Sequence, residues 1–446
     1  MTLPAEARDR YIAAFERVAS DGKGRPAWLR RLRDDARERF VSTGFPNVKN
    51  EDWKYTSVAG IEEREFEIAP CSGGLSSSEI ADTFPSNGAG NVLVFENGRY
   101  RADLSVRRPL PPWVHLGSLS EVLSAGGDVL VPYFSRTPSN AFTDLNTMLM
   151  EDGGFLHIGK GVEVPEPIHL LFLTFDGDRP VMAYPRNVIV AGEGSRVTVV
   201  ERYAGRSDAE CLVNAVTDIA VGRGAAVAHY RLQEDGPGAY HIASLRSRQG
   251  AESRFAAHSV SLGARLSRSD VHAVLDGEEA ECLLNGLYLG NGEQHVDHFT
   301  TIDHAKPGGS SREYYRGILD GRSRGVFRGR VIVRKDAQKT DARQENRNLL
   351  LSKEAEADSR PQLEIHADDV KCTHGATVGP LDEEKVFYLR SRGIDESSAR
   401  GLLAYAFAAD ILRRFDLPEV QRTFEEKLLS WLPDASRIRE FLDEPG

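Results

Sequence analysis

Cysteine is scarce in this sequence. Its 446 residues contain four cysteines, which lie far apart and form no Cys-x-x-Cys pair: Cys71, Cys211, Cys282 and Cys372. Such a set does not supply the closely spaced thiols of a disulfide framework or of a self-contained zinc site. An iron–sulfur cluster usually takes about four thiolates. The chain by itself is therefore not expected to hold a cofactor of this kind tightly.

Long apolar runs are also missing. No stretch reaches the ~18 consecutive apolar residues of a membrane span, and the segment Met1–Arg8 has no apolar core of a signal peptide. The formal net charge of −11 argues against general nucleic-acid binding. We therefore expect a cytoplasmic protein that binds neither membranes nor nucleic acids.

The motifs of several enzyme classes are absent. The sequence contains no G-x-x-x-x-G-K-[ST] phosphate loop, no strand-linked G-x-G-x-x-G and no G-x-S-x-G nucleophile elbow. The chain is therefore not expected to hydrolyse ATP or to catalyse acyl transfer, and we predict that it has no catalytic activity of its own.

Residues 1–90 are predicted to form an N-terminal helical region. Two helices are expected within residues 1–44, because apolar side chains recur at helical spacing, as they do every four residues from Trp28 to Phe40. The motif Trp53-Lys54-Tyr55-Thr56 follows. Its aromatic rings are interpreted as packing anchors.

Residues 91–380 are predicted to form a β core. A strand, a glycine-containing break and a second strand recur, and the glycines are 30, 28 and 27 residues apart: Gly192, Gly222, Gly250 and Gly277. A repeat of this length indicates stacked units, as in a solenoid. Sandwiches and propellers also contain many short strands, so the pattern alone leaves these folds open.

The segment Pro361–Gly379 carries the densest group of candidate ligand side chains. Alternating apolar and polar residues predict a strand at its start. If this strand continued, Cys372 and His374 would lie on the same side as three polar residues: Glu364, His366 and Asp368. A thiolate and an imidazole suit zinc or iron, but these two donors alone do not close a tetrahedral site. Either the fold or another chain completes the site, or the pair is a buried cysteine and a hydrogen-bonded histidine without a metal.

Two further polar groups are interpreted as structural. The first is the segment His295–His298 with Asp303 and His304, which as a strand would direct its side chains to opposite faces. The second is a set of arginines that share one strand face, interpreted as solvated: Arg322, Arg324, Arg328 and Arg330.

Residues 381–446 are predicted to form a C-terminal helical domain. Its first helix is expected over Asp382–Arg392, and its last begins near Asp434. The second is expected to start at Asp395 and to bury an apolar stripe: Leu403, Phe407, Ile411 and Phe415. The third is expected to start at Asp416, with Glu419 completing a capping box.

Three aromatic residues of this domain are candidates for partner binding: Phe387, Tyr388 and Tyr405. If they remain on the outer surface, they can anchor an interface. If they face inward, they are ordinary packing residues. The sequence leaves both interpretations open.

The segment Leu363–Gly379, LEIHADDVKCTHGATVG, closely resembles the signature of the SufB/SufD family of iron–sulfur cluster assembly proteins. The likeness continues through Tyr314–Leu319, Gly325–Gly329 and Phe387–Ile394. Near the N-terminus, Glu51–Thr56 resembles the SufD branch more than the SufB branch. The resemblance implies a mainly β fold, in which a right-handed parallel β-helix is flanked by N-terminal and C-terminal α-helical domains.

The resemblance also implies a function. The chain would be a SufD-like subunit that pairs with a SufB-like subunit and a SufC-like ATPase in cluster assembly and iron acquisition. A nascent iron–sulfur cluster or iron would be shared with SufB, close to Cys372 and His374 at the partner interface. Phe387, Tyr388 and Tyr405 would take part in ATPase docking. An isolated chain could form a homodimer.

Two other functions stay open. One is a SufB-like scaffold or a homodimeric replacement for it, which the Trp53–Thr56 motif and the lack of a Cys-x-x-Cys pair disfavour. The other is a polysaccharide lyase or hydrolase, since β-helices can carry catalytic acids on one solenoid face.

Overall fold

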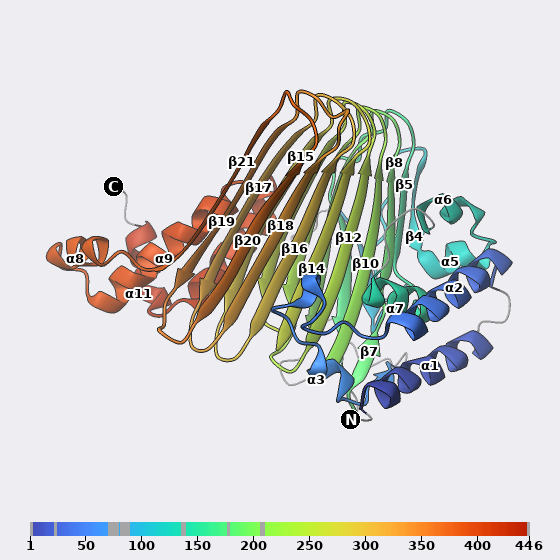
Figure 1. The fold of residues 1–446 in the computed structure, drawn as a ribbon, viewed down its shortest axis with the longest axis horizontal. Helices are drawn as coiled ribbons and strands as arrows, with labels where there is room; N and C mark the ends of the chain where they lie inside the picture. The colour runs from blue at the N-terminus through green and yellow to red at the C-terminus, as the bar shows by residue number, and fades with distance from the viewer. Residues whose placement is uncertain are drawn as a thin grey trace.

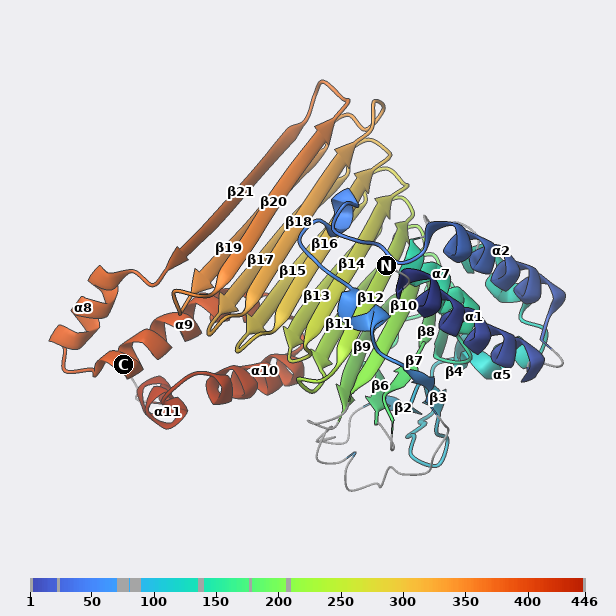
Figure 2. The ribbon, with the colours of Figure 1, turned by 60° about the horizontal axis from the view of Figure 1, so that its bottom comes forward.

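The computed structural model describes residues 3–21, 25–69, 80, 90–134, 140–175, 179–205 and 210–443. Cys71 lies outside these residues. Within them, most of the chain forms a parallel β-helix, with one group of helices near its first turns and a second group that begins at its last turn and runs back along the second sheet (Figures 1 and 2). The predicted mainly β solenoid with helical ends is confirmed, and the sandwich and propeller alternatives are wrong.

Two sheets form the walls of the solenoid. The first sheet runs in the order β20-β18-β16-β14-β12-β10-β8-β5-β4. Its strands are β4 (Val114–Ser118), β5 (Gly154–Ile158), β8 (Arg186–Ala191), β10 (Cys211–Val221), β12 (Tyr240–Gln249), β14 (Leu266–Leu275), β16 (His295–His304), β18 (Arg324–Val333) and β20 (Glu356–Ile365). At its side, β7 (Val181–Ala183) pairs with both β10 and β1 (Glu67–Ile68).

The second sheet runs in the order β21-β19-β17-β15-β13-β11-β9-β6-β2-β3. Its strands are β2 (Asn91–Glu96), β3 (Arg99–Tyr100), β6 (Ile168–Thr174), β9 (Arg196–Gly205), β11 (Ala226–Glu234), β13 (Arg254–Leu262), β15 (Glu281–Gly290), β17 (Ser310–Leu319), β19 (Asp341–Leu350) and β21 (Lys371–Pro380). The chain therefore alternates between the two sheets once per turn (Figure 2).

The recurring glycines lie where successive turns stack closely on one another. The amide of Gly222 donates a hydrogen bond to the carbonyl of Ala191, and Gly250 donates likewise to Val221. A Cβ atom at Gly222 would lie 2.8 Å from the backbone nitrogen of Glu193 in the preceding turn. A side chain there would force the two turns apart, which is why the spacing of these glycines follows the solenoid repeat.

Side chains alternate between the solenoid interior and its outer faces. Phe95, Phe172 and Tyr203 stack in the interior, with ring centroids 4.7 and 4.8 Å apart. Polar groups are buried beside them, among them the pair Glu201 and His229, whose carboxylate and imidazole atoms lie 3.1 Å apart. The interior is thus a packed core with polar side chains embedded in it.

The N-terminal helices cover the outer face of the first sheet. They are α1 (Leu3–Asp21), α2 (Ala27–Thr43), η1 (Glu51–Trp53), α3 (Ala59–Glu62), α5 (Leu119–Ser124), η2 (Asp128–Leu130), α6 (Val131–Phe134) and α7 (Ala141–Leu149). Phe40, Trp53 and Phe142 form one apolar cluster with Leu212 and Tyr240 of the sheet. The two helices predicted within residues 1–44 are confirmed, and the predicted role of Trp53 as a packing anchor is confirmed.

The C-terminal helices pack on the outer face of the second sheet. They are α8 (Glu383–Ser391), α9 (Glu396–Leu412), α10 (Pro418–Trp431) and α11 (Ala435–Asp443). Phe415 contacts the rings of Tyr230 and His258 on the sheet, at centroid distances of 5.6 and 5.0 Å. The side chain of Asp395 caps α9 through the amide of Ser398, as predicted.

Two details of this domain differ from the prediction. α10 begins at Pro418 after Leu417, without a side-chain cap, so the predicted capping box from Asp416 to Glu419 is wrong. The carboxylate of Glu419 instead lies 3.4 Å from the imidazole of His169 on β6. In α9 the fully buried stripe includes Ala404, Ala408 and Ile411, whereas Leu403 and Phe407 are half-buried. Contact with the sheet, rather than apolar spacing alone, determines which side faces inward.

None of the described helices is long and apolar enough to cross a membrane.

Candidate functional site at the open end of the solenoid

The last turn of the solenoid is open. Within the described residues, β20 pairs only with β18, and β21 pairs only with β19, so each leaves one strand edge without a partner. Every residue of β21 is exposed except Cys372 and Gly379, which are half-buried. Figures 1 and 2 show both strands at the end of the solenoid away from the N-terminal helices.

The chain changes sheets within the signature segment. β20 ends at Ile365 and β21 begins at Lys371, in the opposite sheet. The expectation that one strand places Cys372 and His374 beside Glu364, His366 and Asp368 is therefore wrong. The alternation of side chains starts again after the turn, so positions before and after it share no face. The imidazole of His366 lies 3.0 Å from the Glu364 carboxylate.

Cys372 and His374 both lie on the interior side of β21. They pair in register with Ala342 and Gln344 of β19, which are buried in the solenoid. Cys372 is half-buried against the core, and this burial raises the pKa of its thiol. His374 is exposed because no further turn covers β21.

In the part of the chain that the structure describes, neither residue has enough ligand neighbours to form a metal site. Among the described residues, no group of three or more His, Cys, Asp or Glu side chains is arranged to hold a metal ion. Cys282 lies in the same interior column as Cys372 but three strands away, which is roughly 14 Å at the usual strand spacing. The described residues thus do not complete the site, and both completion by another chain and a pair without a metal stay predictions.

The deeper positions next to His374 are polar. Gln344, its neighbour on β19, donates a hydrogen bond of 2.6 Å to the Glu313 carboxylate on β17. Burial raises the pKa of Glu313 to about 7. A line of polar side chains therefore runs inward from His374, but it provides no second strong ligand within reach of Cys372.

The histidine cluster on β16 is structural, as predicted. His295 and Asp297 face outward and contact the hydroxyl of Thr56, at 2.9 and 2.6 Å. His298 faces inward, between the rings of Tyr288 and Tyr315. All three side chains thus have roles in packing and hydrogen bonding within this chain.

The N-terminal motif binds across the last turns of the first sheet. The guanidinium of Arg268 lies over the Trp53 ring, 3.7 Å from its centroid. Glu51 forms an ion pair with Arg360 of β20, and Asp52 lies 3.0 Å from Arg328 of β18. The motif thereby fastens the N-terminal region to the strands that form the open end. The sequence did not indicate the role of Arg360, because its partner lies 309 residues away.

The predicted solvated arginine face is only partly correct. Arg322 lies in the turn before β18 and is exposed, whereas Arg328 is only 8% exposed beneath the N-terminal motif. Two guanidinium nitrogens of Arg324 donate to one oxygen of Asp358. Strand parity identified the shared face of β18, but the packing of a distant segment over that face decided its burial.

The three candidate partner-binding aromatics are not equivalent. Phe387 and Tyr388 are 72% and 56% exposed on α8, which extends beyond the solenoid (Figures 1 and 2). Tyr405 is half-buried in the apolar cluster between α9 and the second sheet. This burial raises the pKa of its hydroxyl. The outer surface of the tail therefore presents Phe387 and Tyr388 much more fully than Tyr405.

Comparison with known proteins extends this description. Residues 173–407 match the family model of the SUF system FeS cluster assembly SufBD core domain. Residues 5–170 match the model of the SufBD protein N-terminal region. The two matches together span the N-terminal helices, the β-helix and the tail as far as α9.

Individual relatives are similar over most of the chain. An iron–sulfur cluster assembly SufBD family protein of Synechocystis sp. is 33% identical over 424 residues, which cover 93% of both chains. The iron–sulfur cluster assembly protein SufD of Escherichia coli is 32% identical over 381 residues, 84% of this chain and 86% of that protein. SufD of Bacillus subtilis is 25% identical over 427 residues, 92% of this chain and 95% of that protein.

Proposed function

The chain belongs to the SufB/SufD family, in its SufD branch, and is a subunit of SUF-type iron–sulfur cluster assembly; we propose that it acts there as a non-catalytic partner of a SufB-like subunit and a SufC-like ATPase. It does so in the cytoplasm and binds no cofactor tightly by itself. ATP hydrolysis belongs to the SufC-like partner. The observation that best supports this proposal is the open last turn of the solenoid, formed by β20 and β21.

The free edge of β21 is suited to pairing with a strand of another chain. The amide of Lys371 donates to the carbonyl of Thr340, the residue just before β19, so by alternation the amides of Cys372, His374 and Ala376 point away from β19. Unpaired, exposed strand edges are templates for strand addition. β21 has no proline between Lys371 and Gly379, and its exposed side chains there include small ones such as Ala376.

The free edge of β20 is less suited to such pairing. The amide of Glu356 donates to Ser323, so by alternation the position of Pro361 faces the free edge. Proline has no amide hydrogen to donate, and its position at an edge blocks strand addition. The two edges of the last turn therefore differ, and β21 is the one proposed to meet the SufB-like subunit.

The same surface accounts for the incomplete ligand pair. Cys372 and His374 lie on β21 with no further ligands in the described part of the chain. A partner strand docked beside β21 could bring its own donors to within reach of these two. We therefore place the nascent cluster or its iron, as cargo of the complex, between the two subunits at this edge.

The tail is proposed to receive the ATPase. Phe387 and Tyr388 are large exposed aromatics on α8, a helix that buries only Val386 fully. Aromatic side chains of this kind are common anchors of protein interfaces. Tyr405 is assigned a supporting role, since its ring is half-buried against the apolar cluster of the C-terminal helices.

The lyase or hydrolase alternative is not favoured. The family matches point to cluster assembly. In addition, three carboxylates on the outer face of the first sheet are held by arginines: Asp218 by Arg186, Asp297 by Arg268 and Asp303 by Arg334. Carboxylates in such pairs are engaged in holding the fold together.

The proposal is tested by purifying the full chain with its cognate SufB- and SufC-like proteins. We expect a stable complex with wild type and with Ala376→Val, which keeps the edge amide. Ala376→Pro removes an amide that β19 does not use, so the fold should be retained while the affinity for the SufB-like subunit falls by about tenfold or more.

Circular dichroism and thermal unfolding of the isolated variants check that both fold. If Ala376→Pro binds the SufB-like subunit as tightly as wild type, the edge of β21 is not the interface. If wild type binds neither protein and instead forms a homodimer through this edge, the heterodimer proposal is wrong.

A further inference from the structure

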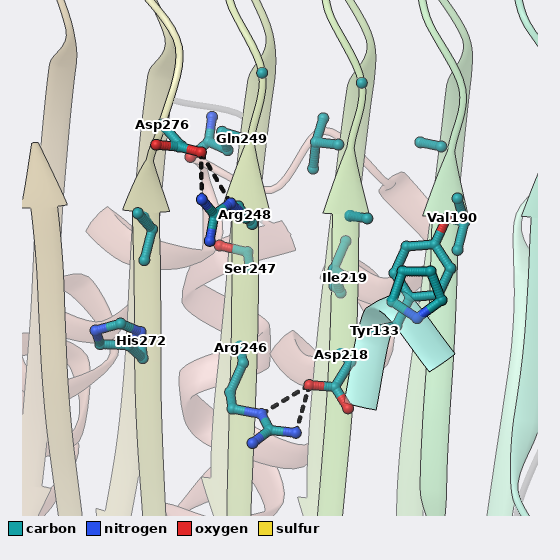
Figure 3. A pocket seen from close by; sticks show the side chains of 17 residues that line it. Tyr133, Val190, Asp218, Ile219, Arg246, Ser247, Arg248, Gln249, His272 and Asp276 are labelled. Carbon is teal, nitrogen blue, oxygen red and sulfur yellow. Dashed lines mark hydrogen bonds and ion pairs between the residues drawn. The ribbon is translucent and has the colours of Figure 1, made fainter. Parts of the chain in front are cut away.

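A cavity lies on the outer face of the first sheet, beside α6 and far from the open end. Its volume is about 420 Å³, and residues of β8, β10, β12 and β14 form its floor. Figure 3 shows Tyr133 of α6 at one side and Arg246 and Asp218 at the bottom. Neither the open end nor the tail contributes to this cavity.

One buried carboxylate in the cavity is shared by two guanidinium groups. Asp218 Oδ2 accepts from Arg186 Nε at 2.9 Å, and Asp218 Oδ1 accepts from Arg246 Nε at 2.7 Å. Arg186, Asp218 and Arg246 are 1%, 5% and 9% exposed. Two buried guanidiniums and one carboxylate leave a net charge of +1, which is costly in a desolvated site unless an anion compensates it.

The two guanidinium groups differ in their other partners, and Arg246 has fewer of them. Arg186 has further partners, because its Nη1 donates to Asn146 and Thr147 at 3.2 and 3.4 Å. Arg246 Nη2 lies 2.6 Å from Asp218 Oδ1 but makes no well-directed hydrogen bond. In Figure 3 the third guanidinium nitrogen of Arg246 carries no dashed line and points away from Asp218.

His272 provides a neutral polar group beside Arg246. The two residues pair in register on β14 and β12, and both line the cavity. Burial lowers the pKa of His272, so its imidazole is neutral at pH 7. Its Nδ1 atom is buried without a hydrogen-bond partner. A neutral imidazole can donate one hydrogen bond to an anion next to a guanidinium.

The rest of the cavity is mostly apolar. Val190, Ala220 and Val274 face it from three strands, and the Tyr133 ring lies beside Val190 (Figure 3). At the rim, two guanidinium nitrogens of Arg248 donate to the same oxygen of Asp276, at 2.9 and 2.6 Å. This pair is neutral as a whole, so the excess positive charge of the cavity is that of the group formed by Arg186, Asp218 and Arg246.

We propose that this cavity binds a small organic anion with one carboxylate and an apolar body, such as a medium-chain fatty acid. The carboxylate binds Arg246 and His272, and the apolar body covers Val190, Ala220 and Val274. A largely apolar pocket with a few convergent polar groups is the usual form of a small-molecule site. The charge of Arg246 selects a carboxylate over an uncharged or cationic head group.

The test compares three probes of equal chain length against the full chain by isothermal titration calorimetry: octanoate, octanol and octylamine. Octanoate should bind at one site per chain, and octanol should bind about tenfold or more weakly, as expected for loss of a hydrogen bond to a charged group. Octylamine should show no saturable binding.

Three variants locate the site. Arg246→Gln leaves the Arg186–Asp218 pair in place. It should lower the affinity for octanoate about tenfold and leave the affinity for octanol unchanged. Ala220→Trp fills the floor of the cavity and should lower the affinity for both octanoate and octanol. Arg322→Gln, at an exposed arginine in a distant turn, is the matched control and should change neither.

Thermal unfolding of each variant confirms folding. Equal affinity for octanoate and octanol in wild type would overturn the proposal, as would octanoate binding that Arg246→Gln leaves unchanged. Absence of saturable octanoate binding to the folded wild type would overturn it as well.

Discussion

At the residue scale, Cys372 and His374 differ in what their surroundings allow. Burial raises the pKa of the Cys372 thiol, which disfavours the thiolate that binds metals. His374 is exposed at the free edge, where its imidazole is accessible to a metal ion. A nearby iron or partner cation would be needed to stabilise the thiolate, so we predict that a change at His374 is the more direct test of this site.

We predict that His374→Ala impairs cluster building without preventing assembly of the complex. The side chain lies on the surface of the last turn, so its removal should leave the fold intact. The rate of cluster formation by the reconstituted complex should fall severalfold, measured by absorbance. His366→Ala is the matched control, because His366 is also exposed but lies in the turn before β21. A normal rate with His374→Ala would mean that this imidazole has no role at the cluster.

At the element scale, the C-terminal helices have two different roles. α9 and α10 cover apolar side chains on the second sheet, including Tyr230, Val260 and Leu287. Deleting the whole tail would expose that apolar surface. A loss of ATPase binding could then result from misfolding as well as from loss of the docking site. α8 buries only Val386 fully, so its outer face can be altered with little effect on packing.

We predict that Phe387→Ser combined with Tyr388→Ser lowers affinity for the SufC-like ATPase by about tenfold or more, because interface aromatics carry a large share of binding energy. Binding is measured by calorimetry with the purified ATPase. The control is Trp113→Ser, which removes a 76% exposed aromatic on the loop before β4. Unchanged affinity in the double variant would move the docking surface away from α8.

At the scale of the whole molecule, titratable groups buried within the stacked turns couple stability to pH. Burial raises the pKa of Glu313 to about 7 and lowers that of His298 to about 3 and that of His304 to about 4. For Glu313, the stabilising effect of the neutral acid is fully present below its unfolded pKa and is lost as the pH rises to about 7. For the two histidines, the stabilising effect is present above the unfolded pKa and is lost on acidification.

We predict that Glu313→Gln is more stable than wild type at pH 8, by up to roughly 3 kcal/mol, because the glutamine never has to ionise in the core. The difference should shrink to about 1 kcal/mol or less at pH 5, where Glu313 is protonated in the folded chain. Urea unfolding of both chains at pH 5, 6.5 and 8 measures this. A difference in the free energy of unfolding that does not change with pH would show that Glu313 is not neutral in the fold.

The sequence by itself determined the features that depend on neighbouring residues. Helical spacing identified the helices at both ends, and the glycine repeat indicated a solenoid, because each turn must stack on the previous one at the same place. The residue types of the segment around Cys372 and His374 also identified the candidate site, although only the resemblance suggested what it does.

The tertiary structure decided everything that depends on contacts between distant turns. It separated Cys372 and His374 from Glu364 by a change of sheet, buried Arg328 under the N-terminal motif, and left Phe387 more exposed than Tyr405. It also brought Arg186, Asp218 and Arg246 together from three turns. Local periodicity reports which side chains share a face of one strand or helix, but it carries no information about which distant segment covers that face.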